Sequence, residues 1–407
     1  MPTGPAPLSA NRRRTILLLS FATFSSMAAQ RICDPMLPEL SREFGASLTQ
    51  SAHVISLFAV VYGLAQLFYG PLGDILGKFR VIAYATLACS LGNLLAVFAG
   101  SLDMLLASRM LVSLVAAAII PLSLAWLGDV VEVNLLQETI ARVGLGTTLG
   151  VASGPLVGGV LTDLLGWRWA FGVLTVLFCV VGTLLVADWR RQRAQLPPAT
   201  DAQDHARPRF ATQAFAILAL PWARTILLVG LIEGAAGFGS LAIWASHLHQ
   251  AMGFSLSAAG AVVALFGVGG MLYMATARQL IRRLRQRGLA LLGSGLIGVC
   301  TLVLAYAPHA WMTLPASLLA GFGFFALHNV MQANVAQLAP HARGTGVSLF
   351  AVSMFAGQSV GVQLAASMIE RWGSGTVIAL GGALLCAAGV FFAQALRRRE
   401  AALLRAS

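Results

Sequence analysis

The chain has 407 residues, of which 58% are hydrophobic and only 10% are charged, and its formal net charge is +12. Soluble domains carry about 25% charged residues, so this composition excludes an ordinary water-facing surface and indicates that lipid surrounds most of the chain. The positive charge does not indicate nucleic-acid binding, because the basic residues lie at the ends of apolar segments rather than on one soluble face. The cysteines lack the spacing of a metal site or a disulfide framework and lie singly in apolar stretches, at Cys33, Cys89, Cys179, Cys300 and Cys386.

Apolar segments of about 20 residues, each long enough to cross the hydrocarbon core, predict twelve membrane-spanning helices. The first six lie near residues 15–37, 50–72, 79–99, 103–127, 140–162 and 168–188. The second six lie near residues 223–247, 257–278, 288–307, 311–335, 344–368 and 374–396. We therefore expect an all-α membrane protein with two six-helix bundles, in residues 1–188 and 223–407, joined by a polar linker in residues 189–222.

The first apolar segment has an alternative interpretation. Arg12–Arg14 precede an apolar run that contains Met27–Ala29, which is similar to a secretory signal peptide with a small-residue cleavage site. The run continues past Arg31 and Asp34, however, and eleven further segments follow. The segment is therefore interpreted as the first membrane helix.

The distribution of basic residues predicts the orientation. With a cytoplasmic N-terminus, the N-terminus, the C-terminus and the loops on the same side hold most of the 27 Lys and Arg residues. The loops on the other side hold Arg42, Arg168 and Arg371. We expect a multi-pass protein of the inner (plasma) membrane with both termini in the cytoplasm.

The segment after the second predicted helix combines turn residues with charge. Glycine permits a tight turn, and an acidic side chain near a helix end can interact with a facing helix N-terminus or an arginine. The residues in question are Gly70, Asp74, Gly77, Lys78 and Arg80. A plain basic loop with turn glycines is the alternative interpretation.

The fifth predicted helix carries glycines at every fourth position, at Gly146, Gly150, Gly154 and Gly158. Residues at this spacing share one helix face, and small side chains there let another helix approach closely. Pro155 removes a backbone donor and is expected to bend the helix, and Gly159 adds freedom. A packing seam without bearing on transport direction is the alternative.

These two motifs resemble the major facilitator superfamily. Gly70–Lys78 resembles its signature loop, Gly-x-x-x-Asp-Arg/Lys-x-Gly-Arg/Lys, although Ile75 stands where a basic residue is usual. Gly150–Gly159 matches the motif Gly-x-x-x-Gly-Pro-x-x-Gly-Gly of the twelve-span drug:proton antiporter branch at every fixed position, and Trp167–Phe171 follows as in that branch. The resemblance implies a two-bundle transporter that exports a small molecule in exchange for protons by alternating access.

Arg109 lies inside the fourth predicted helix. A charge within the bilayer is unfavourable by about 2.5–3.5 kcal/mol, so this side chain must face a cavity or a partner. The superfamily has an arginine here, although Val112 and Ser113 stand where glutamine and glycine are frequent. We expect either a role in proton transfer, or an arginine satisfied by backbone carbonyls or placed near the outer interface.

Two acidic residues are candidates for proton coupling. Asp34 lies near the outer end of the first helix and Glu233 lies in the seventh, and the resemblance implies that both helices line the cavity. Burial favours the neutral form of a carboxyl group, as reversible protonation requires. Arg31 lies three residues before Asp34, so a simple ion pair is the competing interpretation there. Glu233 is the stronger candidate, because it has no basic neighbour within one turn.

Polar residues among aromatics in the tenth and eleventh helices predict a substrate cavity for an amphipathic molecule. The candidates are Phe325, His328, Asn329, Gln332 and Gln358. An interhelical hydrogen-bond cluster is an equal alternative. No metal site or cofactor is expected.

The functional hypothesis is a monomeric secondary transporter whose partners are a small-molecule substrate, protons and the bilayer. An uptake symporter or uniporter of the same fold is the first alternative, and a channel is the second. A membrane enzyme is the third, but the sequence contains no nucleophile with a base, no metal cluster and no phosphate-binding loop.

Overall fold

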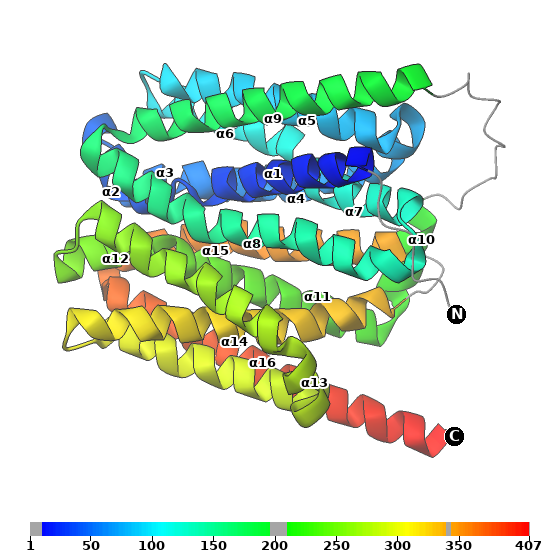
Figure 1. The fold of residues 1–407 in the computed structure, drawn as a ribbon. Coiled ribbons are helices and arrows are strands. Elements are labelled where there is room, and N and C mark those ends of the chain that lie inside the picture. Colours follow the sequence, from blue (N-terminus) through cyan, green and yellow to red (C-terminus); the bar gives the residue numbers. More distant parts are fainter. Residues whose placement is uncertain (1–9, 196–209, 339–342, 407) are drawn as a thin grey trace.

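The computed structural model describes residues 10–195, 210–338 and 343–406, and these ranges are almost entirely helical (Figure 1). The first half contains α1 (Ala10–Arg31), η1 (Asp34–Met36), α2 (Leu37–Phe44), α3 (Leu48–Ser51), α4 (His53–Leu76), α5 (Lys78–Val97), α6 (Leu102–Ala116), α7 (Ile119–Val130), α8 (Val133–Leu164) and α9 (Trp167–Gln195). The second half contains α10 (Phe210–Ala219), α11 (Pro221–Ile232), η2 (Glu233–Phe238), α12 (Gly239–Met252), α13 (Leu256–Tyr306), η3 (Ala310–Met312), α14 (Thr313–Ala336), α15 (Arg343–Trp372) and α16 (Ser374–Ala406).

Eleven helices in the described ranges are long and apolar enough to cross a membrane, and one of them accounts for two spans. Helix α13 has 51 residues, which at ~1.5 Å per residue is more than twice the thickness of the hydrocarbon core. At Arg285 its backbone leaves the helical region, with φ 52° and ψ −177°. The chain turns back there, so the expectation of twelve spans is confirmed.

The twelve spans form two bundles, each with its own apolar core. One core is built mainly from the helices of the first half, joined by Ala242 of α12 and by Phe355, Val362 and Ala366 of α15, and the other is built from α11 to α16. Figure 1 shows the helices of the first half above those of the second half, with their long axes roughly parallel. The two-bundle expectation for the fold is therefore confirmed.

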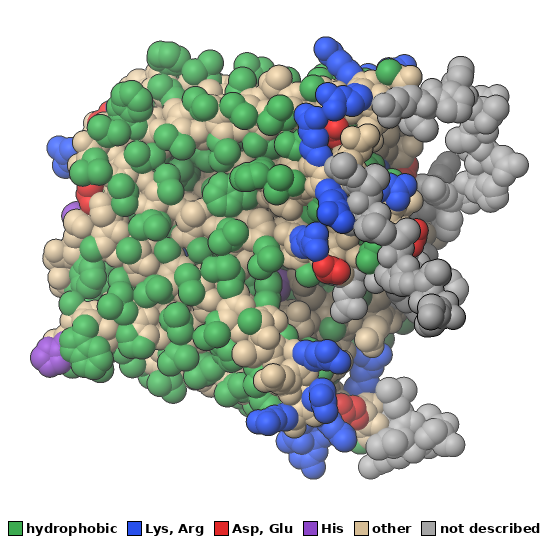
Figure 2. All heavy atoms as spheres, in the orientation of Figure 1, with side chains coloured by type: hydrophobic (Ala, Val, Ile, Leu, Met, Phe, Trp, Pro, Cys, Tyr) green, Lys and Arg blue, Asp and Glu red, His purple; other side chains and the backbone are tan. Residues whose placement is uncertain are grey.

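Charged side chains gather at one end of the molecule. Figure 2 shows Lys and Arg side chains clustered at the end that also carries the N- and C-terminal helix ends in Figure 1, with hydrophobic side chains covering the middle. We call this end the basic face, and we call the opposite end, where α2 and α3 lie, the far face. This distribution is the one expected for a protein whose middle is embedded in lipid.

Two segments extend beyond their predicted bounds. Helix α4 continues through Pro71 to Leu76, so the expected glycine turn is reduced to Gly77, whose φ is +89°. Helix α9 continues into the predicted linker, where Trp189 packs edge-on against Tyr84, with ring centroids 5.6 Å apart. Helix α10 also lies within the predicted linker, and residues 196–209 lie outside the described residues.

The glycines of α8 form a close seam with α1. A Cβ atom at Gly146, Gly150, Gly154 or Gly158 would meet the backbone carbonyl of Ser20, Phe24, Ala28 or Ile32, respectively. Both helices therefore contribute every fourth residue, and they run in the same direction. The second bundle has a similar seam, in which Gly357 and Gly361 of α15 lie against the carbonyls of Leu231 and Ala235. The glycine pattern thus allows two backbones to touch.

Another face of α8 joins the two bundles. A Cβ atom at Gly159 would meet the carbonyl of Leu256 in α13, and one at Gly260 would meet the carbonyl of Pro155. At the far face, Asp163 accepts hydrogen bonds from the backbone N–H groups of Leu256 and Ser257 and from the Ser257 hydroxyl. The acidic side chain of one bundle thus caps a helix of the other.

The seam predicts that a single methyl group at Gly150 destabilises the protein. Gly150→Ala would place Cβ 2.8 Å from Met27 Cβ and against the Phe24 carbonyl, and overpacking of this kind typically costs about 1–3 kcal/mol. Gly144→Ala on the same helix is the control, because a Cβ atom there would meet nothing within 4 Å. Thermal unfolding in detergent should show a lower Tm for the first variant, and an unchanged or raised Tm for the second. Equal Tm values for the two variants would contradict the seam.

Candidate functional site

The first acidic candidate is held in a buried ion pair at the end of α1. Arg31 is the last residue of α1 and Asp34 the first of η1, and their charged groups lie 2.6 Å apart. Both side chains are inaccessible to solvent, and neither charged group has a hydrogen-bond partner among the described residues. The two side chains form an ion pair in this structure, and the pair leaves most of its hydrogen-bonding capacity unused.

Arg109 lies fully buried in α6 and joins three helices of the first bundle. Its Nη1 donates to the Ala29 carbonyl of α1 at 2.8 Å, and its Nε donates to the Val54 carbonyl of α4 at 3.3 Å. The guanidinium group also lies 4.2 Å from the centroid of the Phe58 ring, a favourable cation–π distance. Backbone carbonyls thus bind two nitrogens of this arginine, whereas its Nη2 is buried without a hydrogen-bond partner among the described residues.

The second acidic candidate is paired with a histidine of another helix. Glu233 begins η2, a π-helical segment, and is fully buried. His328 of α14 places Nδ1 3.1 Å from both of its carboxylate oxygens. Short π-helical segments are frequent at functional sites. The sequence indicates both residues separately, but it contains no signal that brings positions 95 residues apart into contact.

A continuous series of contacts links the two acidic groups across the bundle interface. The Arg31 guanidinium lies 5.7 Å from the Phe238 ring of η2. Phe238 packs edge-on against Phe324 at 4.8 Å, and Phe324 stacks on His328 at 5.8 Å. Since His328 contacts Glu233, the series joins the ion pair of the first bundle to the acid of the second.

Other polar contacts cross between the bundles. Gln30 of α1 donates to Gln358 of α15 at 3.4 Å, and Gln363 donates to Ser56 of α4 at 2.7 Å. The Nε2 atom of Gln358 is buried without a hydrogen-bond partner in the described structure, which is unusual for a buried amide.

The remaining cavity candidates differ in their placement. Phe325 is partly buried and packs against Phe324 and Phe266. His328 takes part in the Glu233 pair, whereas Asn329 and Gln332 are exposed on the same helix. The structure therefore brings only part of the predicted polar set together.

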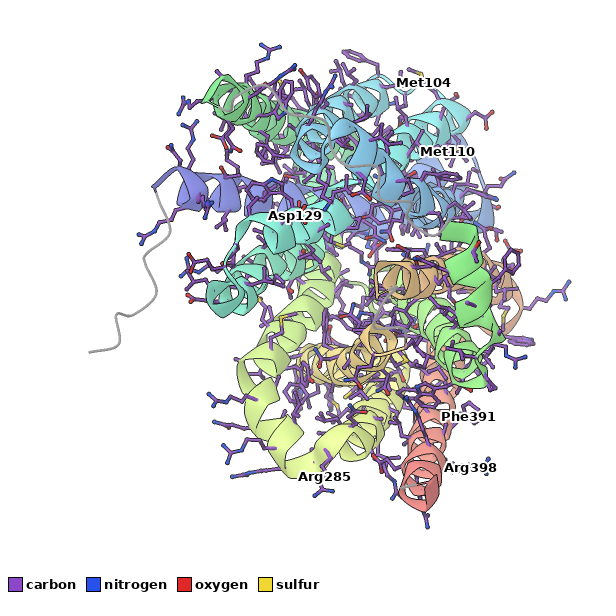
Figure 3. The ribbon with its side chains drawn as sticks, turned by 90° about the vertical axis from the view of Figure 1, so that its right-hand side faces the viewer. Met104, Met110, Asp129, Arg285, Phe391 and Arg398 are labelled. Carbon is purple, nitrogen blue, oxygen red and sulfur yellow. The ribbon has the colours of Figure 1, made fainter. Side chains whose placement is uncertain are left out.

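At the basic face, the signature-loop residues form a small ion network. Lys78 places Nζ 2.5 Å from Asp129 at the end of α7 and 3.9 Å from Asp74. Figure 3 looks onto this face and labels Asp129. Ile75, which replaces the usual basic residue, is 80% exposed. Sequence reasoning missed Asp129, because its partner is 51 residues away.

The other signature residues lie beside this network. Gly70 is within α4, and Gly77 forms the turn between α4 and α5. The Arg80 guanidinium lies 5.6 Å from the Trp189 ring of α9. A Cβ atom at Gly73 would meet Leu122 of α7, so the loop is closely packed against that helix.

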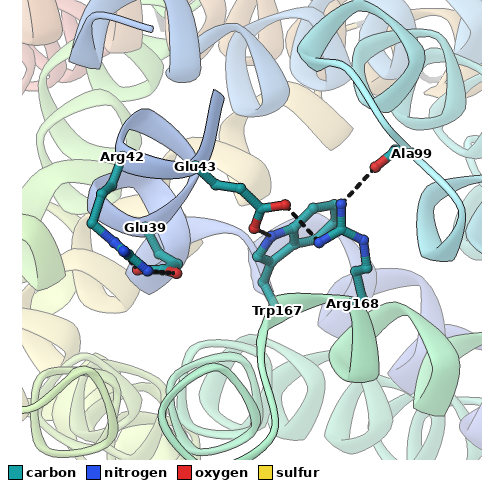
Figure 4. Close-up of polar contacts among 6 residues, drawn as sticks. All are labelled: Glu39, Arg42, Glu43, Ala99, Trp167 and Arg168. Carbon is teal, nitrogen blue, oxygen red and sulfur yellow. Dashed lines mark hydrogen bonds and ion pairs between the residues drawn. The ribbon is translucent and has the colours of Figure 1, made fainter. Parts of the chain in front are cut away.

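A second missed cluster lies at the far face (Figure 4). Glu43 accepts hydrogen bonds from Trp167 Nε1 at 2.5 Å and from Arg168 at 2.6 Å. Arg168 also donates to the Ala99 carbonyl at 2.8 Å and lies over the Trp167 ring. These contacts join α2, α9 and the connection between α5 and α6, so they position helices around the site.

Comparison with known proteins agrees with this architecture. The family model of the Major Facilitator Superfamily matches residues 19–362. The MFS-type transporter YceJ of Bacillus subtilis (strain 168) is 23% identical over 339 residues, which cover 83% of this chain and 85% of that protein. The inner membrane transport protein YnfM of Escherichia coli (strain K12) is 29% identical over 161 residues, which cover 40% of this chain and only 39% of that protein.

A solved structure shows the same fold at low identity. A bacterial homologue of the human lysosomal transporter Spinster, in an inward-facing and unoccupied conformation, aligns with a TM-score of 0.73 and 17% identity. The alignment covers 96% of each chain. The relatives are transporters and not enzymes, which excludes the membrane-enzyme alternative. The chain therefore belongs to the major facilitator superfamily, as a multi-pass membrane transporter of small molecules.

Proposed function

We propose that the protein exports a small amphipathic molecule in exchange for protons, by alternating access between the basic face and the far face. The observation that carries the proposal is the pair of buried acidic groups, Asp34 in the first bundle and Glu233 in the second, joined by a series of side-chain contacts. The match of Gly150–Gly159 to the antiporter motif supports export.

Glu233 is proposed as the principal proton-binding group. A charged carboxylate at this buried position is stabilised mainly by His328, which lies 3.1 Å away. A proton on Glu233 removes that charge and so changes its interaction with His328. Because Glu233 begins the π-helical η2, the change acts at the segment that also carries Phe238 and contacts α15.

Asp34 is proposed as the second proton-binding group, with Arg31 and Arg109 as charged neighbours in the first bundle. Protonation of Asp34 dissolves the ion pair and frees Arg31, whose guanidinium already lies against Phe238 of the other bundle. A ligand shifts a conformational equilibrium only through unequal affinity for the two states. The contact across the interface supplies that difference, because it exists only while the bundles are close together there.

The two faces are proposed to open in turn. At the basic face, Lys78 with Asp74 and Asp129 holds the turn between α4 and α5 against α7. At the far face, the Asp163 cap on α13 and the hydrogen bond from Gln363 to Ser56 hold the bundles together.

We further propose that the protein is a monomer of the inner membrane with both termini in the cytoplasm. The gathering of Lys and Arg at the basic face supports this orientation. The similarity to YnfM, an inner membrane transport protein, supports the location. The segment proposed as the linker between the bundles, residues 189–222, then lies on the cytoplasmic side.

The proposal predicts that Glu233→Gln abolishes proton-coupled transport. Gln keeps the size and hydrogen-bonding capacity of the side chain but cannot exchange a proton. Transport should be measured in proteoliposomes with an imposed pH gradient, using a panel of amphipathic substrates and an uncoupler. We expect gradient-driven transport to fall at least ~100-fold, since a proton-transfer group typically contributes about 10²–10⁴-fold in rate.

The matched control is Glu370→Gln, which removes an exposed carboxylate from α15, and it should retain full activity. Gradient-driven transport by Glu233→Gln at the rate of this control would remove Glu233 from the mechanism. Uncoupler-sensitive accumulation by cells, in place of uncoupler-sensitive exclusion, would instead indicate an uptake symporter.

The buried ion pair predicts a specific pattern of stabilities. Asp34→Asn leaves the Arg31 charge buried without its partner, which typically costs about 3–5 kcal/mol. Arg31→Gln combined with Asp34→Asn removes both charges and should recover most of that loss. Thermal unfolding of the two variants in detergent measures the difference. If the double variant is no more stable than Asp34→Asn, the two side chains stabilise the protein through their packing and not through their charges.

A further inference from the structure

We infer that the groove between α1 and α8, near the basic face, binds one anionic phospholipid of the surrounding bilayer. In this arrangement an acyl chain lies in the groove, and the phosphate is held between Arg13 and Arg142. The groove has a volume of about 550 Å³ and is lined by both arginines together with residues of the two helices.

The shape of the groove follows from the glycine seam. At Gly146 the backbone of α8 lies against the Ser20 carbonyl of α1, so the two helices form a floor of small residues. The Ser20 hydroxyl donates to the Ile16 carbonyl of its own helix at 3.0 Å, which leaves no unsatisfied donor on the floor. The floor is therefore suited to hydrocarbon and not to a polar ligand.

Large apolar side chains form the walls. On α1, Leu17 is 57% and Phe21 is 47% exposed, and on α8, Leu145 is 47% and Leu149 is 46% exposed. Exposed apolar side chains in a row along two membrane helices face lipid tails. The residues that line the groove run from Arg13 to Phe24 along α1 and from Arg142 to Leu149 along α8. The groove therefore follows the two helices, and an extended acyl chain fits it better than a compact molecule.

The charges stand at one end of the groove, where a headgroup would lie. Arg13 is exposed near the start of α1 and has no ion pair in the described structure. Arg142 is paired with Glu138 at 2.6 Å, but both side chains are more than half exposed, and such surface pairs contribute little. Two guanidinium groups at the level of the basic face therefore favour a phosphate, which arginine binds through paired hydrogen bonds.

The groove is separate from the acidic groups proposed for proton coupling. Between them, a Cβ atom at Gly150 would meet the Phe24 carbonyl and one at Gly154 would lie 2.9 Å from the Ala28 carbonyl. Backbones in such contact leave no passage for a solute. The groove consequently opens to the bilayer and is no part of the proposed transport route.

The experiment uses the purified full chain and two phospholipids with the same acyl chains, phosphatidylglycerol and phosphatidylcholine. Native mass spectrometry gives their affinities. We expect Arg13→Gln combined with Arg142→Gln to weaken phosphatidylglycerol binding about 25-fold, because each arginine near an anionic phosphate contributes about fivefold. Phosphatidylcholine binding should change less than about twofold in this variant, since the neutral headgroup gains little from the two charges.

Two controls locate the site. Arg282→Gln combined with Arg283→Gln removes the same charge from an exposed segment of α13 and should leave the affinity for phosphatidylglycerol unchanged. Phe21→Ala removes part of one wall and should weaken the binding of both lipids. Soluble glycerol phosphate, offered at the same concentration, should neither bind nor raise the Tm.

Four results would overturn the inference. The first is equal affinity of the unaltered protein for the two lipids. The second is an equal loss in the α13 control, which would indicate general charge attraction. The third is unchanged lipid binding by Phe21→Ala, which would place the lipid elsewhere. The last is binding of glycerol phosphate as tight as that of the lipid, which would indicate a site for free phosphate.

Discussion

Hydrocarbon offers no hydrogen-bond partner to a charged side chain, and this absence organises the interior of the protein. Arg31, Arg109 and Glu233 are all buried at the depth of the membrane helices, and each turns toward an internal partner. Arg109 binds carbonyls of α1 and α4, and Glu233 contacts α14. The requirement that stabilises each bundle therefore also places ionisable groups in its centre, where a transport site needs them.

The two bundles repeat one packing solution. Glycines at every fourth position of α8 lie against carbonyls of α1, and Gly357 and Gly361 of α15 lie against carbonyls of α11 and η2. In each bundle the helix that carries an acidic candidate is thus contacted backbone to backbone by a neighbour. Little space separates the acid from the neighbouring helix. Interiors that are packed this closely transmit displacements instead of absorbing them. In the proposed mechanism, a proton bound at one of these groups therefore acts on a second helix as well.

Much of the fold could be predicted from the sequence, because membrane spans depend on local hydropathy. The twelve spans were predicted in this way, although α4 and α9 extend further than expected. The glycine seam could also be predicted, because the regular spacing of its glycines lies within one segment of the sequence. The contacts within the site could not be predicted. Glu233 contacts His328, which is 95 residues away in the sequence, and Lys78 contacts Asp129, which is 51 residues away. Glu43 was missed for the same reason, because its hydrogen-bond partners, Trp167 and Arg168, are distant from it in the sequence.

The Asp163 cap at the far face affects how readily the two bundles separate there. Its carboxylate satisfies N–H groups at the start of α13 that would otherwise lack a partner. In the proposed alternating access the bundles separate at this face and water takes the place of the carboxylate, and exchanging one such bond for another changes the free energy by only about 1 kcal/mol. The contact therefore aligns the two halves as they close but releases them readily. Under the proposed alternating access, this contact therefore guides the two bundles into register without adding a deep energetic barrier of its own to their separation.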